Sequence, residues 1–166
     1  MAIFPVKFFG DPVLREKSNI VEKISEDVRV LSTNMANTMY DACGIGLAAP
    51  QIGILRQVVV IDMDKNNYVV YINPTIVEIS KSTEIEDEGC LCVPNISVPV
   101  KRAKSVVVKA LDLKGRALDI EADDLLARIL QHEIDHLNGL TILDRTDDKA
   151  RKSAIQEFLE PKQQEA

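Results

Sequence analysis

Cysteine, histidine and tryptophan are scarce in this chain of 166 residues, which has three cysteines, two histidines and no tryptophan. An odd cysteine count excludes a disulfide framework and leaves core packing, metal ligation or nucleophilic catalysis as roles for Cys43, Cys90 and Cys92. No apolar run approaches the roughly 20 residues that a membrane-spanning helix needs. The N-terminus also lacks the charged start and apolar stretch of a signal peptide. We therefore expect a cytoplasmic protein that does not enter a membrane.

Positive charge is in deficit, with 20 Lys and Arg residues against 26 Asp and Glu residues and a net charge of −6 at pH 7. An acidic surface repels phosphate backbones, so we expect no direct binding of free nucleic acid. The best basic cluster, Lys149, Arg151 and Lys152, lies next to Asp147 and Asp148. We interpret this cluster as the solvated face of a helix.

Hydrophobic residues make up 46% of the chain, and Val, Ile and Leu far outnumber the aromatic residues. This composition favours a packed domain with much β-structure and argues against disorder. Strands are expected at residues 57–62, 68–73, 75–79, 85–93, 105–112 and 116–121, with a further short strand at 141–144. The length fits one domain with a terminal appendage.

Three helices are expected. After Ser25, which suits an N-cap, Val28, Leu31, Met35 and Met39 recur at helical spacing. A second helix runs from about residue 123 to just before the glycine at 139. A third, highly charged helix covers about 146–159, and residues 160–166 are expected to be disordered.

The second predicted helix contains the sequence His132-Glu133-Ile134-Asp135-His136, an H-E-x-x-H motif that includes both histidines of the chain. Histidines at positions i and i+4 lie on one helix face, so their imidazoles can converge on one cation. In this motif Glu133 is the general base that acts on a metal-bound water. The pattern therefore predicts a metal-dependent hydrolase.

The third metal ligand has two candidates, because a catalytic metal of this kind takes three protein ligands and keeps one open position. One candidate is Glu157, an acidic residue downstream, as in many zinc peptidases. The other is the thiolate of Cys90, which follows a flexible glycine. A non-catalytic structural metal site is a further alternative, and Cys92 is the nearby residue that could fill its fourth position.

Three motifs together resemble the peptide deformylase family. Residues 44–51 read Gly-Ile-Gly-Leu-Ala-Ala-Pro-Gln, residues 88–92 read Glu-Gly-Cys-Leu-Cys, and the third motif is the H-E-x-x-H sequence. The family's second motif usually ends in Ser, so Cys92 is a departure. The resemblance covers about residues 5–146. It implies an α+β fold in which mixed and antiparallel sheets wrap around the H-E-x-x-H helix, with a C-terminal helix added.

The resemblance also implies roles for individual residues. Cys90, His132 and His136 would bind one divalent metal ion, Fe(II) in the first place with zinc or nickel as substitutes. Glu133 would transfer the proton, and the Gln51 amide and the Leu91 N–H would stabilise the oxyanion. The residues that would contact the substrate are Ile45 and Gly46.

The implied reaction removes the formyl group from the N-terminal formyl-methionine of new polypeptides and releases formate. Its partners would be formyl-methionyl nascent peptides, and the C-terminal helix is a candidate for transient contact with the ribosome. We expect residues 1–146 to form the single catalytic domain and residues 147–166 to form the C-terminal helix and disordered tail.

Cys92 is expected to be a spectator. In an extended segment, residues two apart lie about 6.5 Å from each other. The thiolates of Cys90 and Cys92 could therefore reach one metal only if the strand bent sharply, since metal–sulfur bonds are about 2.3 Å long.

Overall fold

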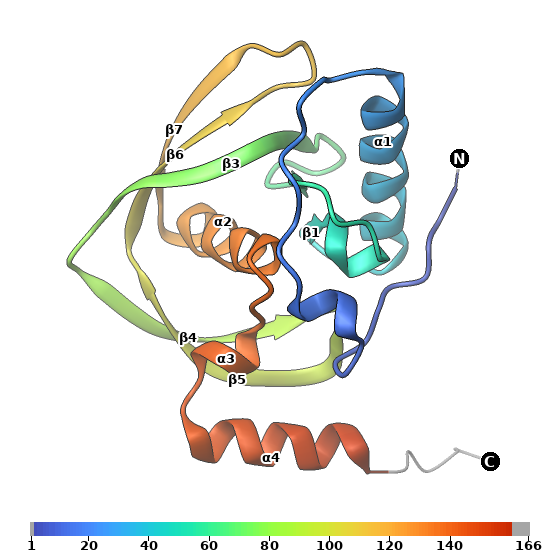
Figure 1. Cartoon of the computed structure of the whole chain (residues 1–166). Coiled ribbons are helices and arrows are strands. Elements are labelled where there is room, and N and C mark those ends of the chain that lie inside the picture. The colour runs from blue at the N-terminus through green and yellow to red at the C-terminus, as the bar shows by residue number, and fades with distance from the viewer. Residues whose placement is uncertain (1, 161–166) are drawn as a thin grey trace.

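A helix enclosed by β-strands forms the centre of the molecule. The computed structural model describes residues 2–160. The central helix is α2 (Asp124–Leu137), and Figure 1 shows strands above and below it. Strands of both sheets contact this helix. The predicted α+β fold, with sheets wrapped around the H-E-x-x-H helix, is confirmed.

The larger sheet has five strands in the order β1-β2-β3-β6-β7, and the smaller sheet pairs β4 with β5. All of these pairs are antiparallel, and a parallel bridge joins Asn19 to Arg56. The strands are β1 (Gly46–Ala48), β2 (Val58–Ile61), β3 (Val69–Ile79), β4 (Thr83–Cys90), β5 (Val93–Ala103), β6 (Ser105–Leu111) and β7 (Ala117–Asp123).

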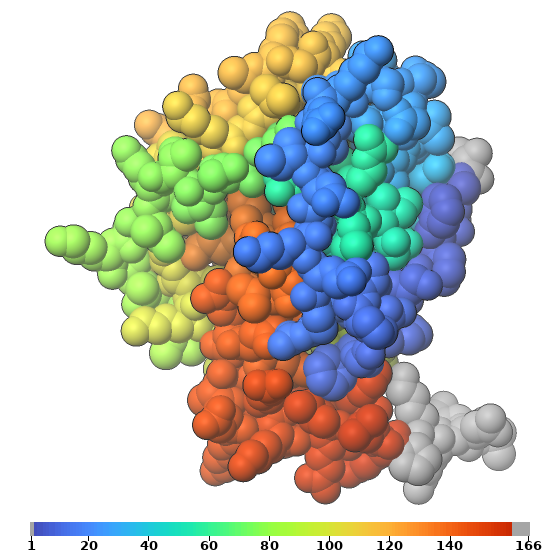
Figure 2. All heavy atoms as spheres, viewed as in Figure 1, coloured from blue at the N-terminus to red at the C-terminus, as the bar shows by residue number. Residues whose placement is uncertain are grey.

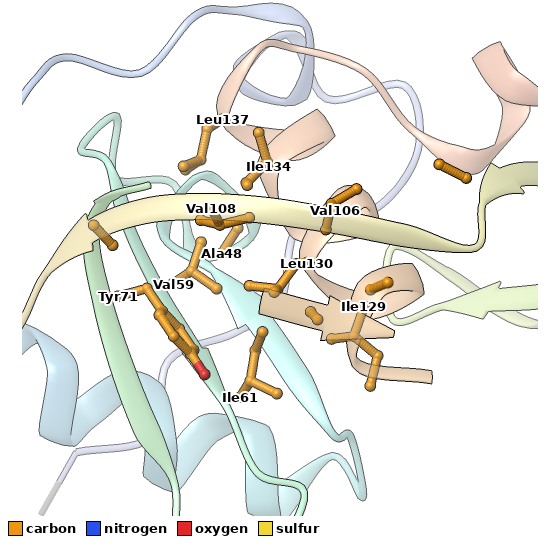
Figure 3. Close-up of a cluster of buried hydrophobic side chains, with 14 residues drawn as sticks. Ala48, Val59, Ile61, Tyr71, Val106, Val108, Ile129, Leu130, Ile134 and Leu137 are labelled. Atoms are coloured by element: carbon orange, nitrogen blue, oxygen red, sulfur yellow. The ribbon is translucent and has the colours of Figure 1, made fainter. Parts of the chain in front are cut away.

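Helices cover both faces of the larger sheet, which explains why β2 is apolar at every position. Val58 and Val60 pack in one cluster with residues of α1 (Glu26–Asp41). Val59 and Ile61 point to the opposite face and pack with residues of α2, as Figure 3 shows. Successive side chains of a strand alternate between faces, so a strand buried on both faces needs an uninterrupted apolar run.

A third apolar cluster joins the smaller sheet to both ends of the chain. It contains residues of β5, α3 (Ile142–Arg145) and α4 (Asp148–Leu159), together with Leu14 of the short helix η1 (Pro12–Arg15). The rings of Phe9 and Phe158 meet edge to face, with centroids 5.8 Å apart. Figure 2 shows the N-terminal segment lying across the surface beside these C-terminal helices. No helix among residues 2–160 is long and apolar enough to cross a membrane.

The C-terminal helix predicted at 146–159 is present as α4. The predicted disorder of residues 160–166 falls, beyond Glu160, outside the described residues. The division into a catalytic part, 1–146, and a C-terminal part stays a prediction.

Three expectations about strands need correction, and the first two concern residues 141–144 and residues 68–79. Residues 141–144 begin a helix, because the Thr141 hydroxyl accepts a hydrogen bond from Leu143 N–H and Asp144 accepts one from Thr141 N–H. This reciprocal pair is a capping box. The strands expected at 68–73 and 75–79 are a single strand, β3, with a register shift between Ile72 and Thr75.

The strand expected at 85–93 ends earlier than predicted. It is β4, which stops at Cys90, and the chain then turns back into β5. Strand β5 was missed because Pro94 and Pro99 lie within it, and proline argues against a strand unless an edge is free. Here β5 pairs only with β4 among the described strands, so one edge needs no N–H donors.

Candidate active site

Helix α2 places three side chains of the H-E-x-x-H motif at the centre of the molecule. Glu133 is 3% exposed and His136 is 1% exposed. The helix ends at Leu137, and Gly139, two residues later, has a φ of 77° in the left-handed region. There Leu140 N–H donates to Asp135 O at 2.9 Å, which satisfies a terminal carbonyl.

The turn between β4 and β5 brings Cys90 to α2. Cys90 pairs with Val93 across this turn, so the chain reverses at Leu91 and Cys92. Cys90 Sγ lies 3.3 Å from His136 Nε2 and 3.1 Å from Cys92 Sγ. The extended geometry expected for residues 90–92 is therefore wrong. The expectation that Cys92 is a spectator depended on that geometry and loses its basis.

His132 is oriented by a buried carboxylate. Its Nδ1 lies 2.9 Å from Glu88 Oε1, and its ring centroid is 5.1 Å from that of His136. A hydrogen bond to Nδ1 fixes the ring and leaves Nε2 as the atom that can bind a metal.

Glu88 belongs to a buried ionic network that links β4, β5 and α2. Arg102 donates to both of its carboxylate oxygens, at 2.9 and 3.0 Å, and Arg128 donates to Oε2 at 2.6 Å. Burial favours the neutral acid, but the hydrogen bonds with His132 and Arg102 outweigh it and lower the pKa of Glu88 to about 2. Arg102 also donates to Asp135, which accepts two further bonds from Arg145. Glu88 is thus held as a charged acceptor for His132.

The Glu133 carboxyl is buried without arginine hydrogen bonds of the kind that stabilise the charge of Glu88. Burial raises its pKa to about 7, and Oε2 has no hydrogen-bond partner among residues 2–160. Its Oε1 lies only 3.0 Å from the place where a β-carbon on Gly46 would be. The absence of a side chain at Gly46 therefore makes room for Glu133.

Gln51 lies in the short helix η2 (Ala49–Ile52) with its amide facing Cys90. Its Oε1 accepts a hydrogen bond from Ala48 N–H at 2.9 Å, and its Nε2 lies 3.6 Å from Cys90 Sγ. The bond from Ala48 fixes which end of the amide is the donor, so Nε2–H is directed into the site.

A cleft of about 660 Å³ opens above these groups. Its walls come from the segment around β1, the strand β4, the following turn and α2. The lining residues include Ile45, Gly46, Gln51, Cys90, Leu91, His132 and Glu133.

Strand β1 presents a free backbone edge to this cleft. It is the first strand of the sheet, and among the strands of residues 2–160 it pairs with β2 alone. Asp62 N–H donates to Ile45 O at 2.9 Å, and Gly46 lies opposite Ile61. Bonded and non-bonded pairs alternate along an antiparallel ladder, so Gly46 directs its N–H and C=O away from β2. The cleft can therefore accept an extended peptide as an added strand.

Comparisons with known proteins agree with this geometry. A sequence model of the family described as polypeptide deformylase matches residues 3–152. The chain belongs to this family. A peptide deformylase of Dictyoglomus thermophilum is 47% identical over 148 residues, which are 89% of this chain and 95% of that protein.

Solved peptide deformylases share the fold. The crystal structure of the Legionella pneumophila protein superposes with a TM-score of 0.90 at 42% identity and covers 95% of this chain and 94% of its own. A peptide deformylase from Ehrlichia chaffeensis in complex with actinonin gives a TM-score of 0.90 at 34% identity, over 95% and 96% of the two chains. Peptide deformylases are enzymes that remove N-formyl groups from nascent peptides, and this chain is an enzyme of that family.

The donor set of this deformylase fits a metal ion. The ligand atoms of Cys90, Cys92 and His136 all lie within 4.8 Å of one another. The hydrogen bond with Cys92 and burial raise the pKa of Cys90 to about 11. Burial lowers the pKa of His132, but hydrogen bonds with Cys90 and Glu88 outweigh it and raise this pKa well above 6.5. Both groups therefore hold protons that a cation would displace on binding.

Glu157, the alternative third ligand, does not join the site of the deformylase. It is exposed on α4, which packs against β5 and lies away from α2 in Figure 1. Glu157 is not among the residues that line the cleft. The structure gives no support to a zinc peptidase that uses this carboxylate.

The sequence alone does not reveal the positioning roles of Glu88 and Arg102 in this deformylase. Glu88 was part of a recognised motif, but its contact with His132 spans 44 positions of the chain. Arg102 is buried in a strand that also contains prolines, and no alternation of polar and apolar residues marks its position. The one available hint was the acidic residue directly before the Gly-Cys pair.

Proposed function

We propose that this chain hydrolyses the formyl group from the N-terminal formyl-methionine of newly made polypeptides and releases formate. The observation that carries the proposal is the meeting of Cys90, His132, His136 and Glu133 beneath a cleft with a free strand edge. An ion-binding centre supports hydrolysis, and the free edge supports a peptide substrate.

The metal would be held by Cys90 Sγ, His132 Nε2 and His136 Nε2. The family resemblance favours Fe(II), with zinc or nickel as substitutes, and one thiolate with two imidazoles suits all three. Three protein donors leave a fourth position free. Once bound, the ion would supply Lewis acidity and lower the pKa of water in the site.

Glu133 would move the proton. Its pKa of about 7 is close to the working pH, which is optimal for a group that must both accept and donate. The unpartnered Oε2 is available to take a proton from water. The same carboxyl would then return this proton to the departing amine.

The developing oxyanion would be stabilised by Gln51 Nε2–H and by the backbone N–H of Leu91. The first donor is held in place by the bond from Ala48 N–H to Gln51 Oε1. Donors fixed before the reaction need no reorganisation when the charge appears.

The substrate would lie along β1. The backbone N–H and C=O of Gly46 would pair with the peptide, and Ile45, which is 50% exposed, would contact its side chains. Because a formyl carbon bears only hydrogen, a narrow site can exclude an acetyl group through its extra methyl. Formyl-methionyl peptides should therefore be cleaved while acetylated peptides are not.

The decisive experiment measures formate release from a formyl-methionyl peptide by the metal-loaded chain and by Glu133→Gln. The variant should keep one metal ion per chain while its turnover falls by about 10²–10⁴-fold, the usual contribution of a positioned proton-transfer group. Asp119→Asn, on the exposed strand β7, serves as the matched control. Endopeptidase activity on unblocked proteins without formate release would refute the proposal.

The cellular context of the reaction stays a prediction. The cytoplasm is the location expected from the sequence. Helix α4 is the candidate for transient contact with the ribosome, since Lys149, Arg151 and Lys152 are all exposed on it.

A further inference from the structure

Cys92 is a buried thiol directed at the candidate metal centre. Its side chain is 0% exposed, and it lies in the turn that reverses the chain after Cys90. Its Sγ lies 3.1 Å from Cys90 Sγ. The ligand atoms of Cys92, Cys90 and His136 form a group within 4.8 Å of one another.

We propose that Cys92 is a further metal ligand, so that Cys90, Cys92 and His136 form a second donor set for a thiophilic ion such as zinc. This inference rests on the proposed function, because Cys90 and His136 belong to both sets. The open set adds His132 and faces the cleft. The second set adds the sulfur of Cys92, in place of His132 or beside it.

The distances suit shared ligation. Two sulfurs bound tetrahedrally at about 2.3 Å from one ion lie about 3.8 Å apart, and a sulfur and an imidazole nitrogen about 3.5 Å apart. The 3.1 Å between the two sulfurs and the 3.3 Å between Cys90 Sγ and His136 Nε2 require small side-chain rotations only. The turn at residues 91–92 makes this possible, since an extended chain would separate the two residues by about 6.5 Å.

The second donor set lies on the buried side of the centre. Cys90, His132, Gln51 and Glu133 line the cleft, whereas Cys92 does not. Cys92 instead packs in the apolar cluster with Val93, Val98 and Ile142. An ion held by both thiolates is therefore drawn away from the cleft. With His132 also bound, four protein donors would close the position that substrate needs.

The metal selects between the two sets by its affinity for sulfur. Thiolate ligands favour zinc and other soft ions more than they favour harder ions. Cys92 should therefore raise the affinity for zinc and lower the turnover of the zinc-loaded enzyme. Serine at this position, which is usual in the family's second motif, offers a harder oxygen donor.

X-ray absorption spectroscopy on the full chain loaded with one zinc ion tests the inference directly. The native chain should show two sulfur ligands at about 2.3 Å, and Cys92→Ser should show one. Cys43→Ser, which alters an exposed cysteine, should keep two. Competition with a zinc chelator should show a loss of affinity of about 10–100-fold in Cys92→Ser.

One sulfur ligand in the native zinc-loaded chain would overturn the inference, and this measurement needs no variant that must fold. If that chain still released formate, the proposed function would stand without the second donor set. If Cys90→Ser kept the full sulfur count and the zinc affinity of the native chain, the ligand set of the proposed function would fail as well.

Discussion

At the scale of single residues, Gly46 and Glu133 compete for the same space. A β-carbon on Gly46 would lie 3.0 Å from Glu133 Oε1 and 3.2 Å from Ile129 Cγ2. The backbone of Gly46 is not in the left-handed region, so the need for glycine here is one of space. The carboxylate reaches its position because the neighbouring strand has no side chain at that point.

Gly46→Ala should therefore displace Glu133. We expect turnover to fall by about 10–100-fold, because a shift of about 1 Å in a reacting group can cost this much. Metal content should be unchanged. The control is Gly89→Ala, whose added β-carbon would meet nothing closer than 3.6 Å and should cost less. Equal losses in the two variants would contradict the steric explanation.

Gln51→Ala tests the other side of the site. It removes the Nε2–H donor while leaving the three proposed ligands in place. Turnover should fall by about 10²–10³-fold, which is the usual effect of losing one oxyanion donor. Steady-state kinetics would check this, and a rate within threefold of the native enzyme would show that Gln51 only shapes η2.

The sequence predicted the residues of the site better than their contacts. Two histidines four apart on a helix must share a face, so the convergence of His132 and His136 follows from helix geometry. The contact of Glu88 with His132 depends on how β4 docks against α2, and no local pattern encodes it. The approach of Cys92 to Cys90 depended on a turn that the pattern of residues 85–93 did not reveal.

At the scale of elements, the end of α2 is fitted closely to the N-terminal segment. A β-carbon on Gly139 would lie 2.5 Å from the carbonyl oxygen of Arg15, and φ at Gly139 is 77°. Space and backbone conformation therefore both require glycine at this position. Ser18 N–H donates to Leu137 O at 2.8 Å, which ties the same two segments together.

Gly139→Ala should lower the free energy of unfolding by about 3 kcal/mol, since left-handed strain and overpacking each cost about 1–3 kcal/mol. Urea denaturation would measure the loss. Gly10→Ala is the matched control: its φ is 101°, and a β-carbon there would meet nothing within 4 Å. The control should show only the cost of strain. If Gly139→Ala lost no more free energy of unfolding than Gly10→Ala, the proposed clash with Arg15 would be refuted.

Elements with a clear period were predicted, and those with a mixed signal were not. The apolar spacing from Val28 to Met39 identified α1 because helix burial repeats every three to four residues. The apolar pair Ile142 and Leu143 fits a strand or a helix equally, and the capping contacts of Thr141 and Asp144 decide for the helix. Strand β5 carries prolines that a paired interior strand would not tolerate.

At the scale of the whole molecule, an ion pair joins segments that are far apart in the chain. Arg15 Nη1 donates to both oxygens of Asp144, at 2.8 and 2.6 Å, across 129 positions. Burial disfavours the charged form of Asp144, but the bonds from Arg15 and from Thr141 N–H outweigh it and lower its pKa below 3.8. A lowered folded pKa means that this carboxylate stabilises the fold above about pH 4 and that the contribution is lost as the pH falls through the folded pKa.

Asp144→Asn should therefore lower the free energy of unfolding at pH 7 by about 1 kcal/mol, a modest value because Arg15 is half exposed. The difference from the native chain should shrink as the pH falls toward 3. Urea denaturation across this range would show it. Asp119→Asn, in the exposed pair with Lys109 at 4.0 Å, should change little at either pH. A difference that did not depend on pH would contradict the role of the Asp144 charge.

The scattered origin of the site has a thermodynamic consequence. Cys90 meets Gln51 across 39 positions, His132 meets Glu88 across 44, and His136 meets Cys90 across 46. The entropy of closing these loops must be lost before Cys90 can meet the histidines, so the unfolded chain offers no preformed site. An ion that binds only the native state stabilises it by about 2.7 kcal/mol at a free concentration one hundred times its dissociation constant. Metal binding and folding are therefore coupled. A substitution far from the cleft that destabilises the fold also lowers the fraction of the chain that holds the metal, and activity falls with it.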